Sequence, residues 1–282
     1  MFNQFIGSLM KAYRNSRFHN REIGLMLAKA LAMVINLRKQ SWVVKEINGI
    51  NFCLDLNQVI DSSLYFSGTF EEPEEKIIES VLKPGMTALD IGANFGYHTF
   101  RMAHLVSPGG TVYAFEPTSW AFEKLIKNAE LNASLNNIRF FKIGLGDTNI
   151  DNTSISFQSS YRLDAQRSDS IERISIAKLD SVVETHEIRQ IDFVKMDVDG
   201  YEFKVISGAL QSLKRFQPSV LLEISPAAMI TNGDDPEDLI AMLISIGYRF
   251  ESNRRMPITD LNANCRKLSG SSSMMVYAFC RN

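Results

Sequence analysis

The sequence predicts an α/β fold with a mostly parallel sheet, helices on both faces of it and a terminal antiparallel strand pair. Short apolar runs alternate with segments of helical period along most of the chain, an order typical of strands joined by crossover helices. Hydrophobic residues make up 45% of the 282 residues, which is enough for a sizeable core. We expect this domain at residues 71–282, after a basic helical extension at 1–40 and a β-hairpin with an approach loop at 41–70.

The overall composition argues against several kinds of partner. A formal net charge of -2 gives no general attraction to nucleic acid, so we expect no nucleic-acid partner. The three cysteines have neither the spacing of a metal site nor that of a disulfide framework. We therefore expect a reducing, cytoplasmic location.

Residues 1–40 form the one strongly asymmetric segment, with seven lysines and arginines against Glu22 alone. The apolar stretch 23–37 is interrupted by Lys29 and is shorter than the roughly 20 apolar residues of a membrane-spanning helix. The same lysine fits poorly in a secretory signal. We expect a helical extension that packs on the main domain or on a second copy of the chain in a homo-oligomer. Peripheral binding to an anionic membrane is the alternative.

The segment between this extension and the main domain begins with a hairpin signal. Two strand-like runs, SWVVKEI and INFCLDL, flank Asn48-Gly49, a dipeptide that favours a tight hairpin turn. Residues 58–70 are expected to be a loop-rich approach. Its aromatic side chains could cover the site or pack on the domain, and we expect packing. An acidic helix with an apolar face at Ile77 and Ile78 should follow.

The stretch Thr87–Gly96, TALDIGANFG, combines a buried strand, an acid and a glycine-bounded turn before a helix. Asp90 is near the end of the strand, at the edge where open α/β sheets bind ligands. Gly92 and Gly96 permit positive φ and close ligand approach, and the following helix directs free N–H groups there. Because Asn94 stands where a dinucleotide fingerprint needs glycine, a nicotinamide cofactor is disfavoured.

A second strand, 111–115, ends at Glu116, and an acid at that edge suits the two hydroxyls of a ribose. A ligand with a ribose, an amino acid carboxylate and no pyrophosphate fits this pattern, and S-adenosylmethionine is such a ligand. Asp147, after a third strand at 138–143, could accept a hydrogen bond from the adenine amino group or could be a turn residue. The predicted cofactor-binding residues are Asp90, Gly92, Asn94, Gly96, Glu116 and Asp147.

The second half of the chain continues the alternation. Residues 151–173 show little period and are expected to form a variable, substrate-facing insert, and Asp180 fits a strand-to-helix junction or a helix N-cap. Pro236 after Asp235 marks a helix start. The other expected elements are strands at 174–176, 191–196 and 219–224, a helix with its stripe over 206–213, and a terminal antiparallel pair at 248–250 and 274–280.

Several blocks together resemble the FkbM-type S-adenosylmethionine-dependent methyltransferases. The blocks are LDIGANFGYHT, AFEP, KLD, IDFVKMDVDGYEFKVISGA and LLEI, in family order, and the resemblance covers roughly residues 60–250. It implies a class I methyltransferase, Rossmann-like fold and O-methylation of a hydroxyl, often on a sugar or a natural-product intermediate. Asp199, where the family more often has glutamate, and His98, where a tyrosine or similar residue is common, depart from the pattern.

The exit of the strand at 191–196 carries the candidate catalytic groups. A general base assists attack by an alcohol, and Asp197 is the first candidate, Asp199 the second and His98 a third. Lys195 could instead neutralise the two aspartates and leave them structural. Asp197, Asp199 and Glu223 could alternatively hold Mg²⁺, but the predicted site contains no metal.

Missing motifs narrow the acceptor. The KMDVDG exit lacks the Asn/Asp-Pro-Pro-aromatic signature of amino-group nucleic-acid methyltransferases, and the Pro-Cys nucleophile of cytosine enzymes is absent. The resemblance to the FkbM-type family implies O-methylation, and we predict a saccharide, glycolipid or natural-product hydroxyl as the acceptor. The alternatives are N-methylation of a small molecule or protein, and a noncatalytic interaction protein with this fold.

Overall fold

The computed structural model describes residues 41–158, 169–268 and 272–280, so the predicted basic extension at 1–40 lies outside the described residues. Within the described ranges, every helix is too short or too polar to cross a membrane. The chain divides into two compact units, which we describe separately. Of the described residues, the first comprises 41–72, 130–132, 155–158 and 169–172, and the second comprises 73–129, 133–154, 173–268 and 272–280.

The first unit contains the predicted hairpin. Strands β1 (Trp42–Ile47) and β2 (Ile50–Asp55) pair in antiparallel fashion. Between them Asn48 and Gly49 have φ of 52° and 78°, the left-handed conformations that a tight hairpin turn requires. The hairpin prediction is confirmed.

The predicted loop over residues 58–70 is wrong, because helix α3 spans Val59–Ser67. Leu64 on this helix is fully buried. Gly68 ends the helix in a left-handed conformation, and its N–H donates to the carbonyl of Leu64. A glycine four residues after a buried leucine is a C-cap signal that the sequence analysis did not use. The aromatic rings of Tyr65 and Phe66 pack edge to face at 5.0 Å.

The second unit is built on a seven-stranded sheet of order β11-β12-β10-β9-β3-β4-β5. Neighbours from β10 to β5 are parallel, and β12 is antiparallel to both β10 and β11. The fold class and the terminal antiparallel pair are thus confirmed. The strands are β3 (Thr87–Ile91), β4 (Thr111–Phe115), β5 (Ile138–Phe141), β9 (Phe193–Met196), β10 (Ser219–Ile224), β11 (Tyr248–Ser252) and β12 (Met274–Cys280).

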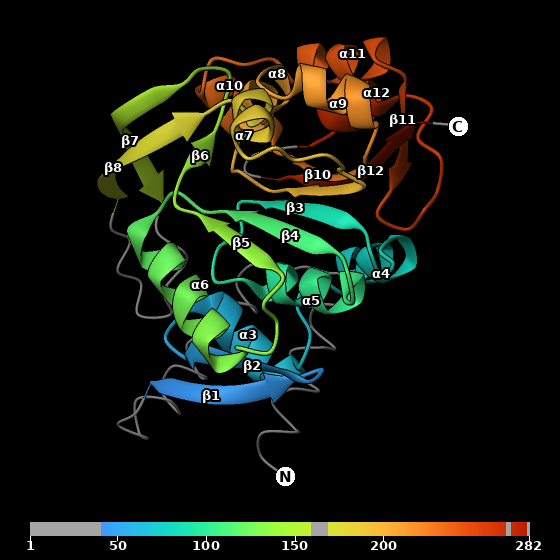
Figure 1. The fold of residues 1–282 in the computed structure, drawn as a ribbon. Coiled ribbons are helices and arrows are strands. Elements are labelled where there is room, and N and C mark those ends of the chain that lie inside the picture. The colour runs from blue at the N-terminus through green and yellow to red at the C-terminus, as the bar shows by residue number, and fades with distance from the viewer. Residues whose placement is uncertain (1–40, 159–168, 269–271, 281–282) are drawn as a thin grey trace. The chain divides into compact units, whose positions relative to one another are not determined.

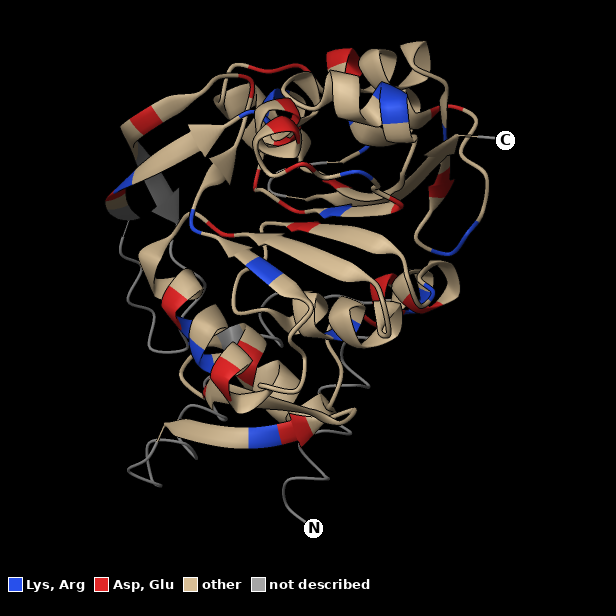
Figure 2. Cartoon of the chain, in the orientation of Figure 1, with Lys and Arg blue, Asp and Glu red and all other residues tan. Residues whose placement is uncertain are grey.

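Helices cover both faces of this sheet (Figure 1). Acidic and basic residues are interspersed along them (Figure 2), in keeping with the small net charge. One face carries α4 (Glu72–Val81), α5 (Tyr97–Val106) and α6 (Ser119–Leu131). The other carries α7 (Leu179–Thr185), α8 (Glu202–Ser207), α9 (Leu210–Phe216), α10 (Pro226–Thr231), α11 (Pro236–Ser245) and α12 (Leu261–Arg266).

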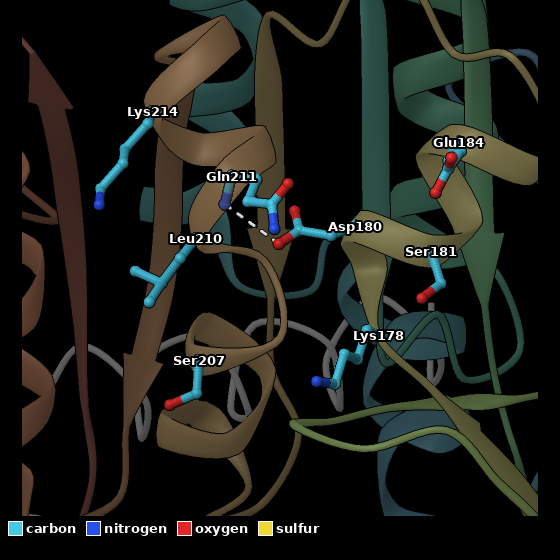
Figure 3. Close-up of a pocket in the computed structure, with 8 residues that line it drawn as sticks. All are labelled: Lys178, Asp180, Ser181, Glu184, Ser207, Leu210, Gln211 and Lys214. Carbon is cyan, nitrogen blue, oxygen red and sulfur yellow. Dashed lines mark hydrogen bonds between the residues drawn. The ribbon is translucent and has the colours of Figure 1, made fainter.

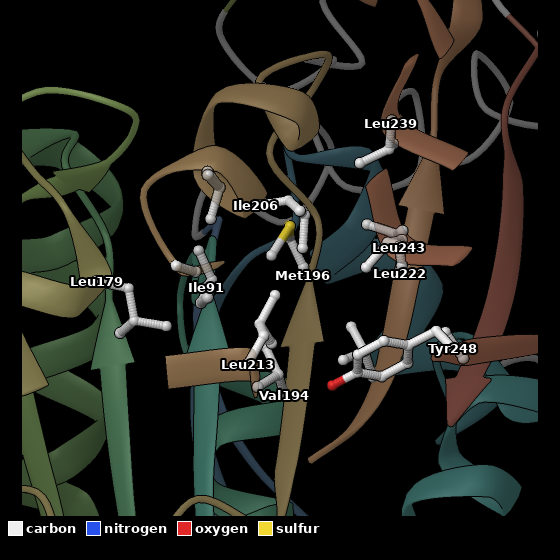
Figure 4. Close-up of a cluster of buried hydrophobic side chains, with 14 of the residues drawn as sticks. Ile91, Leu179, Val194, Met196, Ile206, Leu213, Leu222, Leu239, Leu243 and Tyr248 are labelled. Carbon is white, nitrogen blue, oxygen red and sulfur yellow. The ribbon is translucent and has the colours of Figure 1, made fainter. Parts of the chain in front are cut away.

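The apolar core on the second face explains why the strands read as nearly continuous hydrophobic runs. Alternate strand residues such as Ile91, Met196 and Leu222 pack against helix residues such as Ile206 and Leu243 (Figure 4). All five are at most 1% exposed. The intervening strand positions face the other layer, and these include the polar residues of the site described below.

The predicted single helix with a stripe over 206–213 is wrong, since the structure has two short helices, α8 and α9. The break falls at Gly208, where a β-carbon would lie 1.9 Å from the carbonyl oxygen of Gly146. Glycine at this position allows the helix layer to contact the backbone after β5, and it also weakens a helix interior.

The predicted irregular insert is also partly wrong. Strands β6 (Gly144–Leu145), β7 (Ile150–Gln158) and β8 (Asp169–Ala177) form a three-stranded sheet of order β6-β8-β7. The short strand expected at 174–176 is the end of the longer β8, and residues 159–168 lie outside the described residues. Apolar and polar residues alternate only weakly along these strands, because the sheet leaves even an apolar residue such as Ile150 44% exposed.

Candidate functional site

Asp90 lies in the central strand β3 and is 1% exposed. Its Oδ2 atom accepts a hydrogen bond of 2.5 Å from the hydroxyl of Thr99 on α5. Its Oδ1 atom is buried and has no hydrogen-bond partner among the described residues. An unsatisfied buried carboxylate oxygen is energetically costly, so this atom is suited to accept a hydrogen bond from a bound ligand.

The glycine turn after β3 depends on left-handed backbone conformations. Gly92, Asn94 and Gly96 have φ of 83°, 51° and 94°. A β-carbon on Gly96 would lie 2.5 Å from side-chain atoms of both Leu125 and Phe100, so a larger residue there would displace the core. The turn thus places the start of α5 beside the end of β3, as the sequence predicted.

Glu116 joins the exit of β4 to this turn. One carboxylate oxygen accepts the N–H of Asn94 at 2.9 Å, and the other accepts the N–H and the hydroxyl of Thr118 at 2.9 and 2.5 Å. Burial raises the pKa of Glu116, while these hydrogen bonds act to lower it. A carboxylate has about four lone-pair positions, so Glu116 retains capacity to accept from ligand hydroxyls.

Asp147 follows β6 and is exposed. A β-carbon on Gly208 would lie 3.3 Å from its α-carbon, so Asp147 is next to the break between α8 and α9. No contact joins it to Asp90 or Glu116 among the described residues, and its proposed contact with adenine remains a prediction.

The exit of β9 is packed against the glycine turn. The N–H of Asp197 donates to Ile91 at 3.0 Å, and the carbonyl oxygen of Asp197 would be 1.9 Å from a β-carbon on Gly92. The buried Lys195 places its Nζ atom 3.4 Å from Asp197 Oδ2. Asp199 has φ of 51° and is exposed. The protein atoms around its carboxyl group nevertheless remove part of its water, and this desolvation and the charge of Asp197 raise the pKa of Asp199 against the effect of Lys195.

Glu223, near the end of β10, completes a carboxylate cluster. Oxygen atoms of Asp197, Asp199 and Glu223 lie within 4.8 Å of one another. The spacing would suit a divalent cation, but clusters of this kind are common in proteins without one. We therefore assign no metal.

His98 is 5% exposed in the first turn of α5, with its ring centroid 5.1 Å from that of Tyr97. The charge of His98 acts to lower the pKa of both Asp197 and Glu75, so it lies near both carboxylates. Glu75 on α4 accepts a 2.5 Å hydrogen bond from the Tyr97 hydroxyl and is 6% exposed. The role of Glu75 could not be predicted from the sequence, because an acid in a Glu-rich helix start carries no sign of burial.

Asp180 of the KLD block has a structural role between two helices. Its carboxylate accepts from the N–H groups of Gln211 and Ser212 at 3.1 and 2.8 Å, and from the Ser212 hydroxyl at 2.6 Å. Figure 3 shows this side chain directed from α7 toward the start of α9, in a cavity of about 420 Å³. Asp180 is therefore an N-terminal cap of α9, whereas Lys178 occupies the N-cap of its own helix α7.

The strand order, the glycine turn after β3 and the acid at the exit of β4 define a class I S-adenosylmethionine-dependent methyltransferase. The family model described as the methyltransferase FkbM domain matches residues 90–250. This match covers more than half of the 282 residues, and the chain belongs to this family. S-adenosylmethionine is accordingly the cofactor.

Similar proteins include hexuronic acid methyltransferase AglP from Haloferax volcanii, which is 28% identical over 158 residues. The aligned part is 55% of this chain and 59% of AglP, so the chain spans less than two thirds of that relative. A crystal structure of methyltransferase FkbM from Methylobacillus flagellatus has 16% identity and a TM-score of 0.47, over 77% of this chain and 52% of that one. A TehB-like methyltransferase from Corynebacterium glutamicum has 13% identity and a TM-score of 0.42, over 78% and 94%.

Proposed function

We propose that the chain transfers a methyl group from S-adenosylmethionine to a hydroxyl oxygen of a saccharide, glycolipid or natural-product intermediate. The observation that carries the proposal is the position of three carboxylates, Asp90, Glu116 and Asp197, at the exits of the adjacent parallel strands β3, β4 and β9. In open α/β sheets the ligand crevice lies outside these exits.

The residues around the glycine turn fit the cofactor. The free Oδ1 atom of Asp90 can accept one of its polar hydrogens, and Glu116 can accept from the ribose hydroxyls. Glycine at positions 92 and 96 allows the positive φ angles of the turn that precedes the start of α5. The proposed cofactor-binding residues are those of the sequence prediction: Asp90, Gly92, Asn94, Gly96, Glu116 and Asp147.

When bound, S-adenosylmethionine supplies a methyl group activated by a positively charged sulfur. The protein has to align the acceptor oxygen and accept its proton as the C–O bond forms. We assign this proton to Asp197, which Lys195 holds from one side at 3.4 Å. Asp199 and His98 remain the second and third candidates.

The charge of the crevice favours a neutral acceptor. Asp197, Asp199 and Glu223 gather at the strand exits, and Lys195 already contacts Asp197. An acceptor carboxylate would meet repulsion there, whereas a hydroxyl could donate a hydrogen bond to the cluster. AglP is named for a hexuronic acid, which supports a sugar acceptor for this chain. A hexuronic acid carries both hydroxyl oxygens and carboxylate oxygens, so the oxygen that receives the methyl group has to be tested.

Cofactor binding tests the first half of the proposal. We expect calorimetry to show saturable binding of S-adenosylmethionine to the wild type and a binding constant at least about tenfold weaker for Asp90→Asn. The matched control is Asp235→Asn, at the exposed cap of α11, where asparagine can still accept from Glu237. No binding by folded wild-type protein would contradict the proposal.

Product analysis tests the acceptor. The protein is incubated with S-adenosylmethionine and a neutral hexose, a hexuronic acid or an amino sugar, each as a glycoside. A methyl ether survives mild alkali, whereas a methyl ester is cleaved, so mass spectrometry before and after alkali separates the two oxygens. An alkali-stable product supports the proposal. Ester formation only, or methylation only of an amino sugar nitrogen, would overturn it.

A further inference from the structure

Glu223 faces Asp197 from the neighbouring strand. Leu222 of β10 and Met196 of β9 are the last pair of this parallel ladder, and Glu223 and Asp197 are the residues that follow them. Their carboxyl groups belong to the cluster whose oxygen atoms lie within 4.8 Å of one another. Two ionised carboxylates this close repel each other, so a single proton held between the two groups is favoured.

Each member of the pair contacts a different kind of group. The hydroxyls of Ser273 and Ser225 donate to the two oxygens of Glu223, at 2.5 and 3.3 Å. The ammonium group of Lys195 is 3.4 Å from Asp197 Oδ2. A cation stabilises the ionised form of its neighbour more than a hydroxyl does, so the negative charge belongs on Asp197.

We propose that Asp197 and Glu223 share one proton, which resides on Glu223, and that Glu223 is a positioning residue that fixes the ionised carboxylate of Asp197. The link to catalysis rests on the proposed function. The shared proton itself is a property of the protein without substrate, and it can be measured independently.

The surrounding charges are consistent with this assignment. Burial, followed by the charge of Asp197, raises the pKa of Glu223 to about 8. For Asp197, burial acts to raise the pKa, but Lys195 and the hydrogen bond from Glu223 outweigh it, so the pKa is lowered. The other titratable groups that act on or respond to this pair are Asp199 in the turn after β9, His98 on α5 and Glu202 on α8.

The proposal has a consequence for methyl transfer. The acceptor oxygen forms a bond to the methyl carbon, the carbon–sulfur bond breaks with its electron pair moving to sulfur, and the hydroxyl proton passes to Asp197. While Glu223 is protonated, its hydrogen bond makes Asp197 a weaker base. When Glu223 ionises, at about pH 8, Asp197 becomes a stronger base, so the rate of transfer should rise there.

The test is a pH titration by ¹³C NMR of protein labelled at the glutamate carboxyl carbons, without cofactor or acceptor. We expect one glutamate to titrate at about pH 8 and its signal to be missing in Glu223→Gln. The midpoint should move up in Ser273→Ala, which removes a donor that favours the ionised form, and down in Asp197→Asn. Glu202→Gln identifies the second elevated glutamate, and circular dichroism verifies that each variant is folded.

Two results would overturn the proposal that Asp197 and Glu223 share a proton. One is a Glu223 midpoint near the ordinary value of 4.5. The other is a saturable loss of the elevated titration on addition of MgCl₂, which would make the three carboxylates a cation site. If the elevated titration is found but S-adenosylmethionine does not bind, the proposed function is wrong and the shared proton is still supported. If binding and turnover are intact but the elevated titration is absent, only the shared-proton proposal is wrong.

Discussion

The carbonyl oxygen of Asp197 occupies the space that a side chain at Gly92 would need. A β-carbon there would lie 1.9 Å from this oxygen, so the exits of β3 and β9 approach each other as closely as they do only because residue 92 is glycine. This contact joins the proposed cofactor turn to the proposed catalytic carboxylate.

Gly92→Ala should therefore push the glycine turn after β3 away from Asp197 at the exit of β9. The control is Gly233→Ala, because Gly233 has φ of 84° against 83° for Gly92 and has no atom within 4 Å of a β-carbon. Both variants incur backbone strain of roughly 1–2 kcal/mol. We expect Gly92→Ala alone to lose binding of S-adenosylmethionine by at least about tenfold in calorimetry, because the turn must shift. Equal binding by the two variants would show that the contact is not needed.

Asp180 should contribute to stability and not to cofactor binding. Its carboxylate accepts two backbone N–H groups at the start of α9, and loss of a cap costs about 1–2 kcal/mol. We expect Asp180→Ala to lower the free energy of unfolding in urea by this amount and to leave the affinity for S-adenosylmethionine unchanged. Asp180→Asn, which keeps one acceptor, should lose less than half as much. A weakened affinity with unchanged stability would point instead to a role in the site.

Much of the fold could be predicted because local signals and burial agree. The strands β4 and β10 have the predicted bounds, and Asp235 caps α11 as the Asp-Pro pair predicted. The sequence failed where the deciding contact is distant. The break between α8 and α9 depends on Gly146, which is 62 positions before Gly208 in the numbering.

The candidate site likewise contains features that the local sequence predicts and features that depend on distant contacts. The acids after each strand were recognisable from their place in the sequence, since strand exits of a parallel sheet converge. The relation between Asp197 and Glu223 depends on β9 and β10 being neighbours in the observed register, which no local pattern states. Burial of Glu75 likewise depends on contact between α4 and Tyr97 on α5.

Glu202 should make the protein less stable as the pH rises. It is fully buried, its Oε2 atom has no hydrogen-bond partner among the described residues, and burial raises its pKa from 4.5 to about 7. A raised pKa means that the folded state favours the protonated form. The stabilisation is present below pH 4.5 and is lost as the pH rises through about 7.

Glu202→Gln removes this charge and keeps an acceptor for the N–H of Gly200. We expect urea unfolding to show a gain of up to about 3 kcal/mol at pH 8 and little change at pH 4.5. The matched control is Glu237→Gln, in the first turn of α11, where the exposed pair with Arg266 should be worth less than about 1 kcal/mol. A gain of the same size at both pH values would show that the buried charge is not its cause.

Asp197→Asn should reduce the rate of methyl transfer far more than it affects cofactor binding. Asparagine preserves the shape and the backbone contact with Gly92, but it cannot accept a proton, so we expect single-turnover rates to fall by about 10²- to 10⁴-fold. Asp199→Asn should have a smaller effect, because this residue is exposed, whereas the ammonium group of Lys195 lies 3.4 Å from Asp197 Oδ2. The affinity for S-adenosylmethionine should stay within about threefold of wild type in both. A larger loss in Asp199→Asn than in Asp197→Asn would move the role of base to Asp199. Equal, small losses in both would leave His98 as the candidate, and His98→Gln would then be the variant that abolishes turnover.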